Sequence, residues 1–297
     1  MKLGVGFPQT DIGGDPIVAR DFAQAVEGMG YTHLAAYDHV VGANTERRPN
    51  WRGPYSSKDC FHDPFVLFGY LAGVTRQIEM TTQILILPQR QTVLVARQAA
   101  SVDLLSGGRL RLGIGIGWNA LEYVALGEEF GTRGKRSEEQ AEVLRLLWTQ
   151  EHVTYKGARH EIRDVGLNPM PMQRPIPLWF GGHADVVLRR IARLGDGWIT
   201  IIHTPEQAAG EIVKLARYAQ EAGRAPGAVG VDAWVTMGNG TPDDWRREVS
   251  AWKALGVRYL TLNTAFAQAH HARIPGTSVD AHLAAMRQYR ETVADLL

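Results

Sequence analysis

The sequence lacks several features that mark specialised classes of protein. It holds one cysteine, Cys60, in 297 residues, which excludes an internal disulfide and a metal site built from several cysteines. It has no run of eighteen apolar residues, and no signal-peptide layout at Met1. The formal net charge is +1, so nothing in the composition indicates a nucleic-acid surface. We expect a cytoplasmic protein that binds neither membrane nor nucleic acid.

Familiar catalytic motifs are missing as well. There is no G-x-S-x-G elbow and no Walker-type loop, so hydrolases and nucleoside triphosphatases lose their main support. The histidines show no paired spacing with carboxylates of the kind that holds a metal ion. We therefore expect no metal, and an organic cofactor in its place.

What the chain does contain is a repeated alternation of strand and helix. Eight short apolar runs are each followed by a turn signal and an amphipathic stretch, which predicts parallel strands joined by helical crossovers. At this length the pattern predicts a single domain, 1–297, of the α/β class: an eight-stranded parallel (β/α)8 TIM barrel. The predicted strands are Leu3–Phe7, His33–Tyr37, Ile78–Leu87, Leu110–Ile116, Ile176–Phe180, Gly197–Ile202, Val229–Thr236 and Tyr259–Asn263.

Helix starts and long loops complete the prediction. Four Asp-Pro or Thr-Pro pairs put a side-chain acceptor at the N-cap and proline at the first helical position. A capping box at Ser137 and Gln140 predicts a further start, and Ser278 or Asp280 caps the last helix. Residues 42–62, 150–174 and 265–277 form insertion loops, the second with a hairpin. We expect the pocket walls to come from the loop that holds Trp51 and from the segments 153–171 and 265–275. The four pairs begin at Asp15, Asp63, Thr204 and Thr241.

The fourth predicted strand ends in three alternate glycines, Gly113, Gly115 and Gly117. Because glycine packs no side chain, such a run indicates close approach by a ligand or by neighbouring backbone. Residues 115–120 also fit a loose dinucleotide fingerprint, but that motif belongs in the first strand-to-helix turn, and about three strand–helix units precede this one. Tight barrel packing without a ligand is the simpler alternative.

Two other strand ends carry candidate residues. Strand five runs into Gly181, Gly182 and His183 before a helix, where backbone N–H groups and the helix dipole favour a phosphate. Strand two ends in Asp38 and His39. An imidazole exchanges protons near neutral pH, so His39 is a candidate to face the substrate, while Asp38 would accept hydrogen bonds from a ligand or nearby backbone. Both residues have a simpler alternative role in capping the next loop.

Six motifs together resemble the bacterial luciferase-like superfamily, and in particular its branch of oxidoreductases that use the deazaflavin coenzyme F420. The likeness extends from Leu3 to about Asn263, and the segment 96–118 is its most specific part. The motifs are YDH (37–39), TQILILP (82–88), RQAASVDLLSGGR (97–109), LGIGIGW (112–118), WFGG (179–182) and LGDGW (194–198).

The resemblance implies a homodimer whose cofactor ring lies at the carboxyl ends of the strands. It implies catalytic roles for His39 and Asp38, with Asp38 also on the cofactor side. It implies a non-prolyl cis peptide between Gln83 and Ile84 that supports the ring. The remaining implied cofactor-binding residues line the ring (Gly115, Ile116, Gly117 and Trp118) or bind the phosphate (Gly181, Gly182 and His183).

In function, the resemblance implies hydride transfer between F420 and a small organic substrate. Sugar-phosphate dehydrogenases of this branch have a glutamate where this chain has Trp118, so that substrate class is not predicted. Two alternatives stay open: an FMN-dependent monooxygenase that uses reduced FMN and oxygen, and a non-catalytic flavin-binding barrel.

Overall fold

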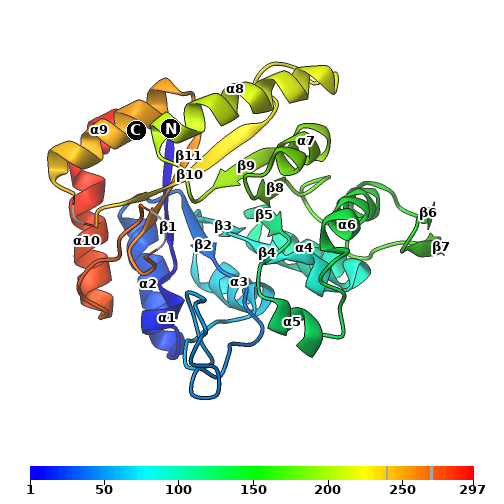
Figure 1. Cartoon of the computed structure of the whole chain (residues 1–297), viewed down its shortest axis with the longest axis horizontal. Helices are drawn as coiled ribbons and strands as arrows, with labels where there is room; N and C mark the ends of the chain where they lie inside the picture. Colours follow the sequence, from blue (N-terminus) through cyan, green and yellow to red (C-terminus); the bar gives the residue numbers. More distant parts are fainter. Residues whose placement is uncertain (239, 268–269) are drawn as a thin grey trace.

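Eight parallel strands close into a barrel within the part of the chain that the computed structural model describes, residues 1–238, 240–267 and 270–297 (Figure 1). Each strand pairs with its neighbours in the order β3-β2-β1-β11-β10-β9-β8-β5, and β3 pairs with β5 to close the ring. The predicted TIM barrel is therefore confirmed. The barrel strands are β1 (Lys2–Gly6), β2 (His33–Ala36), β3 (Glu79–Thr82), β5 (Leu110–Gly115), β8 (Leu178–Gly181), β9 (Gly197–Thr200), β10 (Gly230–Thr236) and β11 (Tyr259–Asn263).

Strand three departs from its predicted span. The prediction was one strand over Ile78–Leu87, whereas the structure has β3 and then a separate two-residue strand, β4 (Leu85–Ile86), paired with β5. The break lies at the Gln83–Ile84 peptide, which is cis as expected. The chain therefore bends at the carboxyl end of β3, where the site is predicted.

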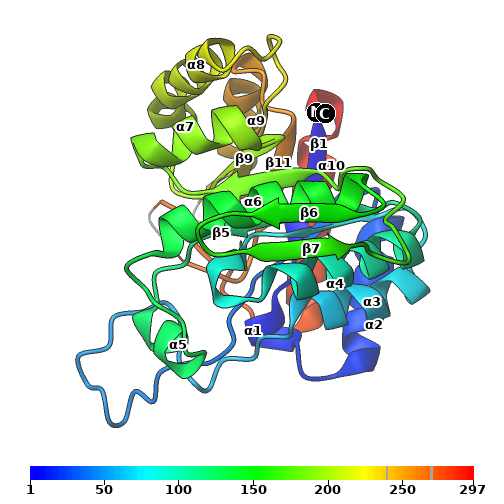
Figure 2. The same ribbon diagram turned by 90° about the vertical axis from the view of Figure 1, so that its right-hand side faces the viewer.

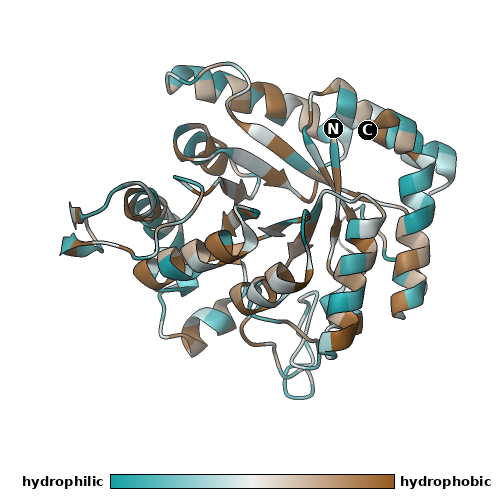
Figure 3. Ribbon diagram, turned by 180° about the vertical axis from the view of Figure 1, so that it is seen from behind, coloured by the Kyte–Doolittle hydropathy of each residue, from teal (hydrophilic) through white to brown (hydrophobic). Residues whose placement is uncertain are grey.

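Helices surround the barrel and turn their apolar faces to it, as the two-toned ribbons of Figure 3 show. The four Asp-Pro and Thr-Pro starts are confirmed, because each Asp or Thr side chain accepts a backbone N–H of the first turn. The helices are α1 (Gln9–Ile12), α2 (Pro16–Gly28), α3 (Pro64–Val74), α4 (Thr92–Ser106), α5 (Ala120–Ala125), α6 (Arg133–Thr149), α7 (Asp185–Leu194), α8 (Pro205–Glu221), α9 (Pro242–Ala254) and α10 (Val279–Thr292), with short 3-10 helices at Leu87–Gln89 and Ala294–Leu296.

One predicted helix start is wrong, and the structure decides between the two candidate caps of the last helix. Ser137 does not begin a helix: it is buried inside α6, which starts at Arg133. The Ser-x-x-Gln spacing recurs by chance within helices, and here Gln140 instead donates to the carbonyl oxygens of Leu87 and Arg90. Of the two candidates for the last helix, Ser278 is the cap, since its hydroxyl accepts the N–H of Ala281.

The insertion loops lie outside the barrel wall. The predicted hairpin is present as β6 (Val153–Lys156) and β7 (Glu161–Val165), which lie beside α6 (Figure 2). The loop that follows β2 extends away from the body of the molecule on the side of α5. Loops after strands stand at the catalytic face of such barrels, so this loop adds to the wall of any site there.

A charged network fills the amino-terminal half of the barrel. Arg111 is 2% exposed and donates to Asp232 (2.8 Å) and to Glu79 (2.6 Å). Its guanidinium lies against the rings of Trp179 and Tyr259, 4.6 and 4.2 Å from their centroids, and the two rings also contact each other. Charge buried this deeply is tolerated because it is paired and hydrogen-bonded. This end of the barrel is closed.

Candidate functional site

The carboxyl end of the barrel holds a cavity of about 640 Å³. Its lining is mainly apolar with a few polar groups, which is typical of small-molecule sites. All of the residues predicted for the site line this one cavity: Asp38, His39, Gln83, Ile84, Gly115, Ile116, Gly117, Trp118, Gly181, Gly182 and His183.

The segment that joins β3 to β4 reaches both the cavity and the closed end of the barrel. The side chain of Gln83 donates to Asp232 Oδ2 (2.8 Å) and to Thr261 Oγ1 (2.9 Å), and it accepts the indole N–H of Trp234. Gln83 is therefore tied to the buried network, while Ile84 lies next to it in the cavity wall. The cis peptide between them stands at the boundary between the two halves.

The three alternate glycines in and just after β5 make room for the chain from the end of β3 to β4. A Cβ on Gly113 would lie 2.0 Å from the carbonyl oxygen of Thr82, and one on Gly115 would lie 2.5 Å from the side chain of Ile84. A Cβ on Gly117 would meet Ile86 at 2.8 Å, and Gly117 also has a positive φ of 62°. The packing alternative thus explains why these residues are glycines, although Gly115 and Gly117 line the cavity as well.

Asp38 is buried, and both of its carboxylate oxygens already have partners. One accepts the N–H of Ile86 (2.9 Å), and Arg90 donates to the other (2.8 Å). Arg90 also pairs with Asp63 (2.9 Å), the cap of α3. The expectation that Asp38 accepts from neighbouring backbone is confirmed. Its observed contacts hold the segment after β4 in place.

His39 is in a different environment. The side chain is 18% exposed, and its ring lies on Tyr55 with centroids 3.8 Å apart and edge-on to Phe61. Nδ1 lies 3.4 Å from Oε1 of Glu122, a fully buried carboxylate in the first turn of α5. Sequence reasoning missed Glu122, although its place just after the glycine-rich strand was a usable signal.

The pKa of Glu122 is lowered. Burial opposes its ionisation, but His39, Gln89 and the N–H of Val40 together outweigh burial and keep the pKa below its ordinary value. A carboxylate at this position favours a proton on the imidazole nitrogen that faces it.

The end of the cavity at β8 has free backbone donors. The N–H groups of Gly182, His183 and Ala184 donate to no other described residue, and these residues are exposed just before α7. The ring of His183 lies 5.9 Å from that of His203. Burial, followed by the neighbouring His183, lowers the pKa of His203. The arrangement fits an anion, as predicted from the two glycines.

Aromatic side chains form the outer wall of the cavity. The ring centroids of Trp51 and Trp118 lie 5.6 Å apart, and Tyr55 meets Trp118 at the same distance. The indole N–H of Trp51 donates to the Tyr55 carbonyl oxygen (2.8 Å), a bond within the loop after β2. Trp234, in β10, and Phe266 line the opposite side.

The expected pocket walls are confirmed in part. The loop that holds Trp51 and the segment that begins at Ala265 both line the cavity. The expectation for 153–171 is wrong, because the lining contains no residue of that segment, which contains the hairpin beside α6. Tyr55, Trp234 and Phe266 were not predicted as individual residues.

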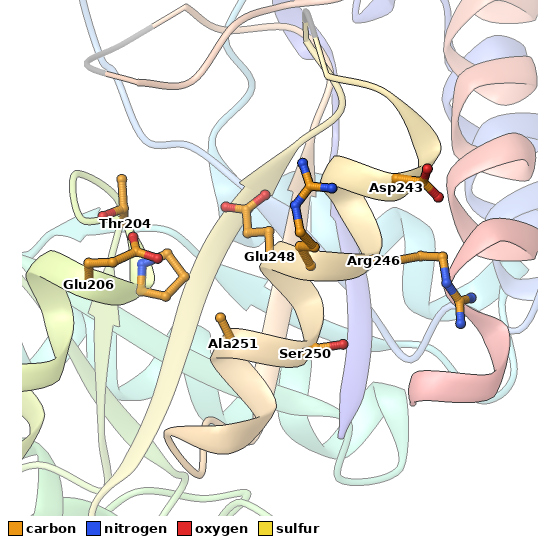
Figure 4. Close-up of a pocket in the computed structure, with 9 residues that line it drawn as sticks. Thr204, Glu206, Asp243, Arg246, Glu248, Ser250 and Ala251 are labelled. Carbon is orange, nitrogen blue, oxygen red and sulfur yellow. The ribbon is translucent and has the colours of Figure 1, made fainter.

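A second hollow lies between α8 and α9, away from the strand ends (Figure 4). It is lined by charged side chains that include Glu206, Arg246 and Glu248. Burial, with a smaller contribution from the nearby Glu206, raises the pKa of Glu248 to about 7. Arg246 is occupied by Asp295 (2.6 Å). Helix residues and the cap of α8 line this hollow, and no strand residue does, so the barrel cavity is the better candidate.

The described part of the chain holds neither a group of metal ligands nor a helix that could span a membrane. Among residues 1–238, 240–267 and 270–297, no three His, Cys, Asp or Glu side chains are grouped so that they could hold a metal ion. None of the helices in the described ranges has both the length and the apolar character to cross a bilayer.

Comparisons with known proteins agree with the geometry. An uncharacterized protein of Mycobacterium tuberculosis is 32% identical over 262 residues, which are 86% of this chain and 89% of that protein. The FMNH(2)-dependent dimethylsulfone monooxygenase of Pseudomonas putida is 30% identical over 178 residues, 59% of this chain and 48% of its own.

Solved structures share the whole fold. A long-chain alkane monooxygenase superposes with a TM-score of 0.80 at 13% identity, over 99% of this chain and 92% of its own. An F420-dependent secondary alcohol dehydrogenase superposes with a TM-score of 0.72 at 18% identity, over 99% of both chains. A family model described as luciferase-like monooxygenase matches residues 6–293. The chain therefore belongs to the luciferase-like monooxygenase family of oxidoreductases.

Proposed function

We propose that the protein is an F420-dependent oxidoreductase that transfers a hydride between the deazaflavin and a small organic substrate. The observation that carries this proposal is a histidine whose Nδ1 faces a buried carboxylate and whose ring forms part of the wall of an apolar cavity at the strand ends. The Asp38-His39 pair at the end of strand two favours the deazaflavin branch.

The residues of the cavity fit such a cofactor. Ile84, Ile86 and the backbone of Gly115 offer an apolar surface at the strand ends, and the free N–H groups of Gly182 and His183 suit a phosphate. When bound, the deazaflavin supplies the hydride chemistry. The protein binds and orients the ring, keeps water from it, and moves a proton at His39.

An FMN-dependent monooxygenase is the second candidate. It is supported by the relative from Pseudomonas putida, whose name states dependence on FMNH2. The same cavity and the same free N–H groups suit the ring and phosphate of FMN. A barrel that binds a flavin without turnover is the third candidate.

The decisive experiment titrates the purified protein with F420 and with FMN in parallel. We expect tight binding of F420, seen as a change in its fluorescence, and no oxygen consumption. Tight binding of FMN together with reductase-dependent oxygen uptake would establish the monooxygenase instead. Gly182→Val is the test of the phosphate site: at φ 116° a side chain is strained and meets Val187 at 3.2 Å, so affinity should fall.

His39→Ala tests whether the barrel is catalytic. Since the ring is the proton-exchanging group in the wall, turnover should fall by about 10²-fold or more. Cofactor affinity and the unfolding midpoint should change little. Unchanged turnover would assign His39 a structural role.

We also propose a homodimer that forms through α3 and α4. Helix α3 is apolar on all sides, yet Val66 is 71% exposed, and on α4 Leu105 is 70% exposed. An exposed apolar patch of this kind is typical of a protein interface. Light scattering gives the mass in solution, and a dimer that Val66→Asp and Leu105→Asp leave intact would rule out this face.

A further inference from the structure

Glu122 makes contacts that the proposed function does not yet use. Its side chain has no exposed surface. Oε1 accepts the N–H of Val40 at 3.0 Å and lies 3.4 Å from Nδ1 of His39, while Oε2 lies 3.4 Å from the amide nitrogen of Gln89. One buried carboxylate thus reaches both the backbone and the imidazole at the end of β2.

The two nitrogens of His39 have different surroundings. Nδ1 is buried and makes no hydrogen bond in this geometry, so Glu122 at 3.4 Å is its nearest acceptor among the described residues. Nε2 hydrogen-bonds to no described residue and is not among the buried, unpartnered atoms, so it is accessible from the cavity. Catalytic hydrogen bonds are often long before a substrate binds, and a small rotation of the ring closes this one.

The packing around His39 limits any larger rotation. The ring of Tyr55 lies against one side of the imidazole, with centroids 3.8 Å apart, and the ring of Phe61 meets it edge-on, with centroids 4.8 Å apart. The other ionisable groups nearby are already engaged: Asp38 pairs with Arg90, and the Tyr55 hydroxyl accepts from Asn119 (2.9 Å). Glu122 is therefore the charged group free to act on the imidazole.

We propose that Glu122 is a positioning residue that keeps the proton of neutral His39 on Nδ1 and so presents an unprotonated Nε2 to the cavity. This inference rests on the proposed function only in naming what the proton transfer serves. If the bound cofactor accepts a hydride from a substrate carbon, the proton of the hydroxyl on that carbon would pass to Nε2, and Glu122 would stabilise the resulting imidazolium. In the reverse direction Nε2 returns that proton.

The experiment follows the His39 imidazole itself. Long-range proton–nitrogen NMR of the wild-type protein identifies which ring nitrogen carries the proton, and the His39→Ala spectrum assigns the signal among the ten histidines. We expect the Nδ1–H form in the wild type. In Glu122→Gln, the side-chain NH2 can face Nδ1 in place of a carboxylate oxygen, so the share of the Nδ1–H form of His39 should fall and the Nε2–H form should appear.

The chain offers a matched control. Glu139 pairs with Nδ1 of His160 at 2.8 Å, and both side chains are mostly buried between α6 and the hairpin. Glu139→Gln should lower the share of the Nδ1–H form at His160 and leave that at His39 unchanged. If Glu122→Gln does not fold, Glu122→Asp keeps the carboxylate but withdraws it, and the share of the Nδ1–H form of His39 should fall by less.

Two results would overturn the proposal: a proton on Nε2 in the wild type, or a share of the Nδ1–H form of His39 that neither Glu122 variant changes. Neither result depends on the cofactor. Failure of the proposed function would show itself separately, as FMN binding and oxygen uptake with the Nδ1–H form still present.

Discussion

The two ends of the barrel differ in whether their polar groups have partners within the protein. At the amino end, Arg111 has Asp232 and Glu79 within 2.8 Å and lies against two aromatic rings. At the carboxyl end, His39 faces Glu122 with one nitrogen and the cavity with the other, and the N–H groups before α7 have no partner among the described residues. The same strands therefore build a closed end, where the charges are paired within the protein, and an open one.

The closed end contributes to stability, whereas the open end is available for function. A polar group in a closed interior must find its partner within the protein, because no water or ligand can reach it. At the open end, unused donors and acceptors remain available to a ligand. Asp38 and its partner Arg90 stand at the open end, yet they are paired like the groups at the closed end.

The largest expected effect is at the closed end. Arg111→Met removes the partner of Asp232 and leaves a carboxylate that is fully buried. We expect the free energy of unfolding to fall by about 3 to 5 kcal/mol. Denaturant unfolding followed by tryptophan fluorescence measures this free energy. A loss below about 1 kcal/mol would contradict the claim that the closed end contributes to stability.

A smaller effect is expected for Asp38→Asn. The neutral side chain can still accept the N–H of Ile86, but Arg90 keeps only Asp63 as an anionic partner. We expect a loss of about 1 to 3 kcal/mol and weaker cofactor binding, because the segment after β4 loosens. Unfolding curves and cofactor titrations check both. Unchanged stability with lost turnover would instead favour the catalytic role predicted for Asp38.

The smallest effect concerns a carboxylate with no arginine partner. Glu248, between α8 and α9, has a pKa raised to about 7 by burial. The folded protein therefore binds the proton more tightly than the unfolded chain, and stability is lost as pH rises from about 4.5 to 7. Glu248→Gln should add about 1 to 2 kcal/mol at pH 8 and little at pH 5. Equal gains at the two pH values would mean that Glu248 is not the titrating group.

The fold was predictable because its signals are local. The apolar runs of the eight strands, and the proline after Asp15, Asp63, Thr204 and Thr241, act within one element. The Ser137 capping box failed because its spacing is compatible with the inside of a helix, and burial of Ser137 decided between the two. The cis peptide at Gln83–Ile84 was implied by the family resemblance, whereas periodicity predicted one unbroken strand there and missed the break.

The site was predicted in part, and the missed residues share a cause. Glu122, Tyr55, Trp234 and Phe266 come from four different segments and meet only when the barrel closes. Hydrophobic periodicity places a residue on a strand or helix but does not say what faces it across the cavity. Roles for Asp38 and His39 therefore remain predictions that the variants above test.

The sequence by itself determined the barrel, the position of the strand ends and most of the cavity lining, because these depend on short-range pattern and on a motif set. Only the tertiary structure decided what each residue contacts there. It showed that the glycines in and just after β5 make room for Thr82, Ile84 and Ile86. It also showed that Asp38 pairs with Arg90 and that His39 faces Glu122. These pairs are separated by 52 and 83 positions, and residues so far apart in the chain interact only once the sheet is closed.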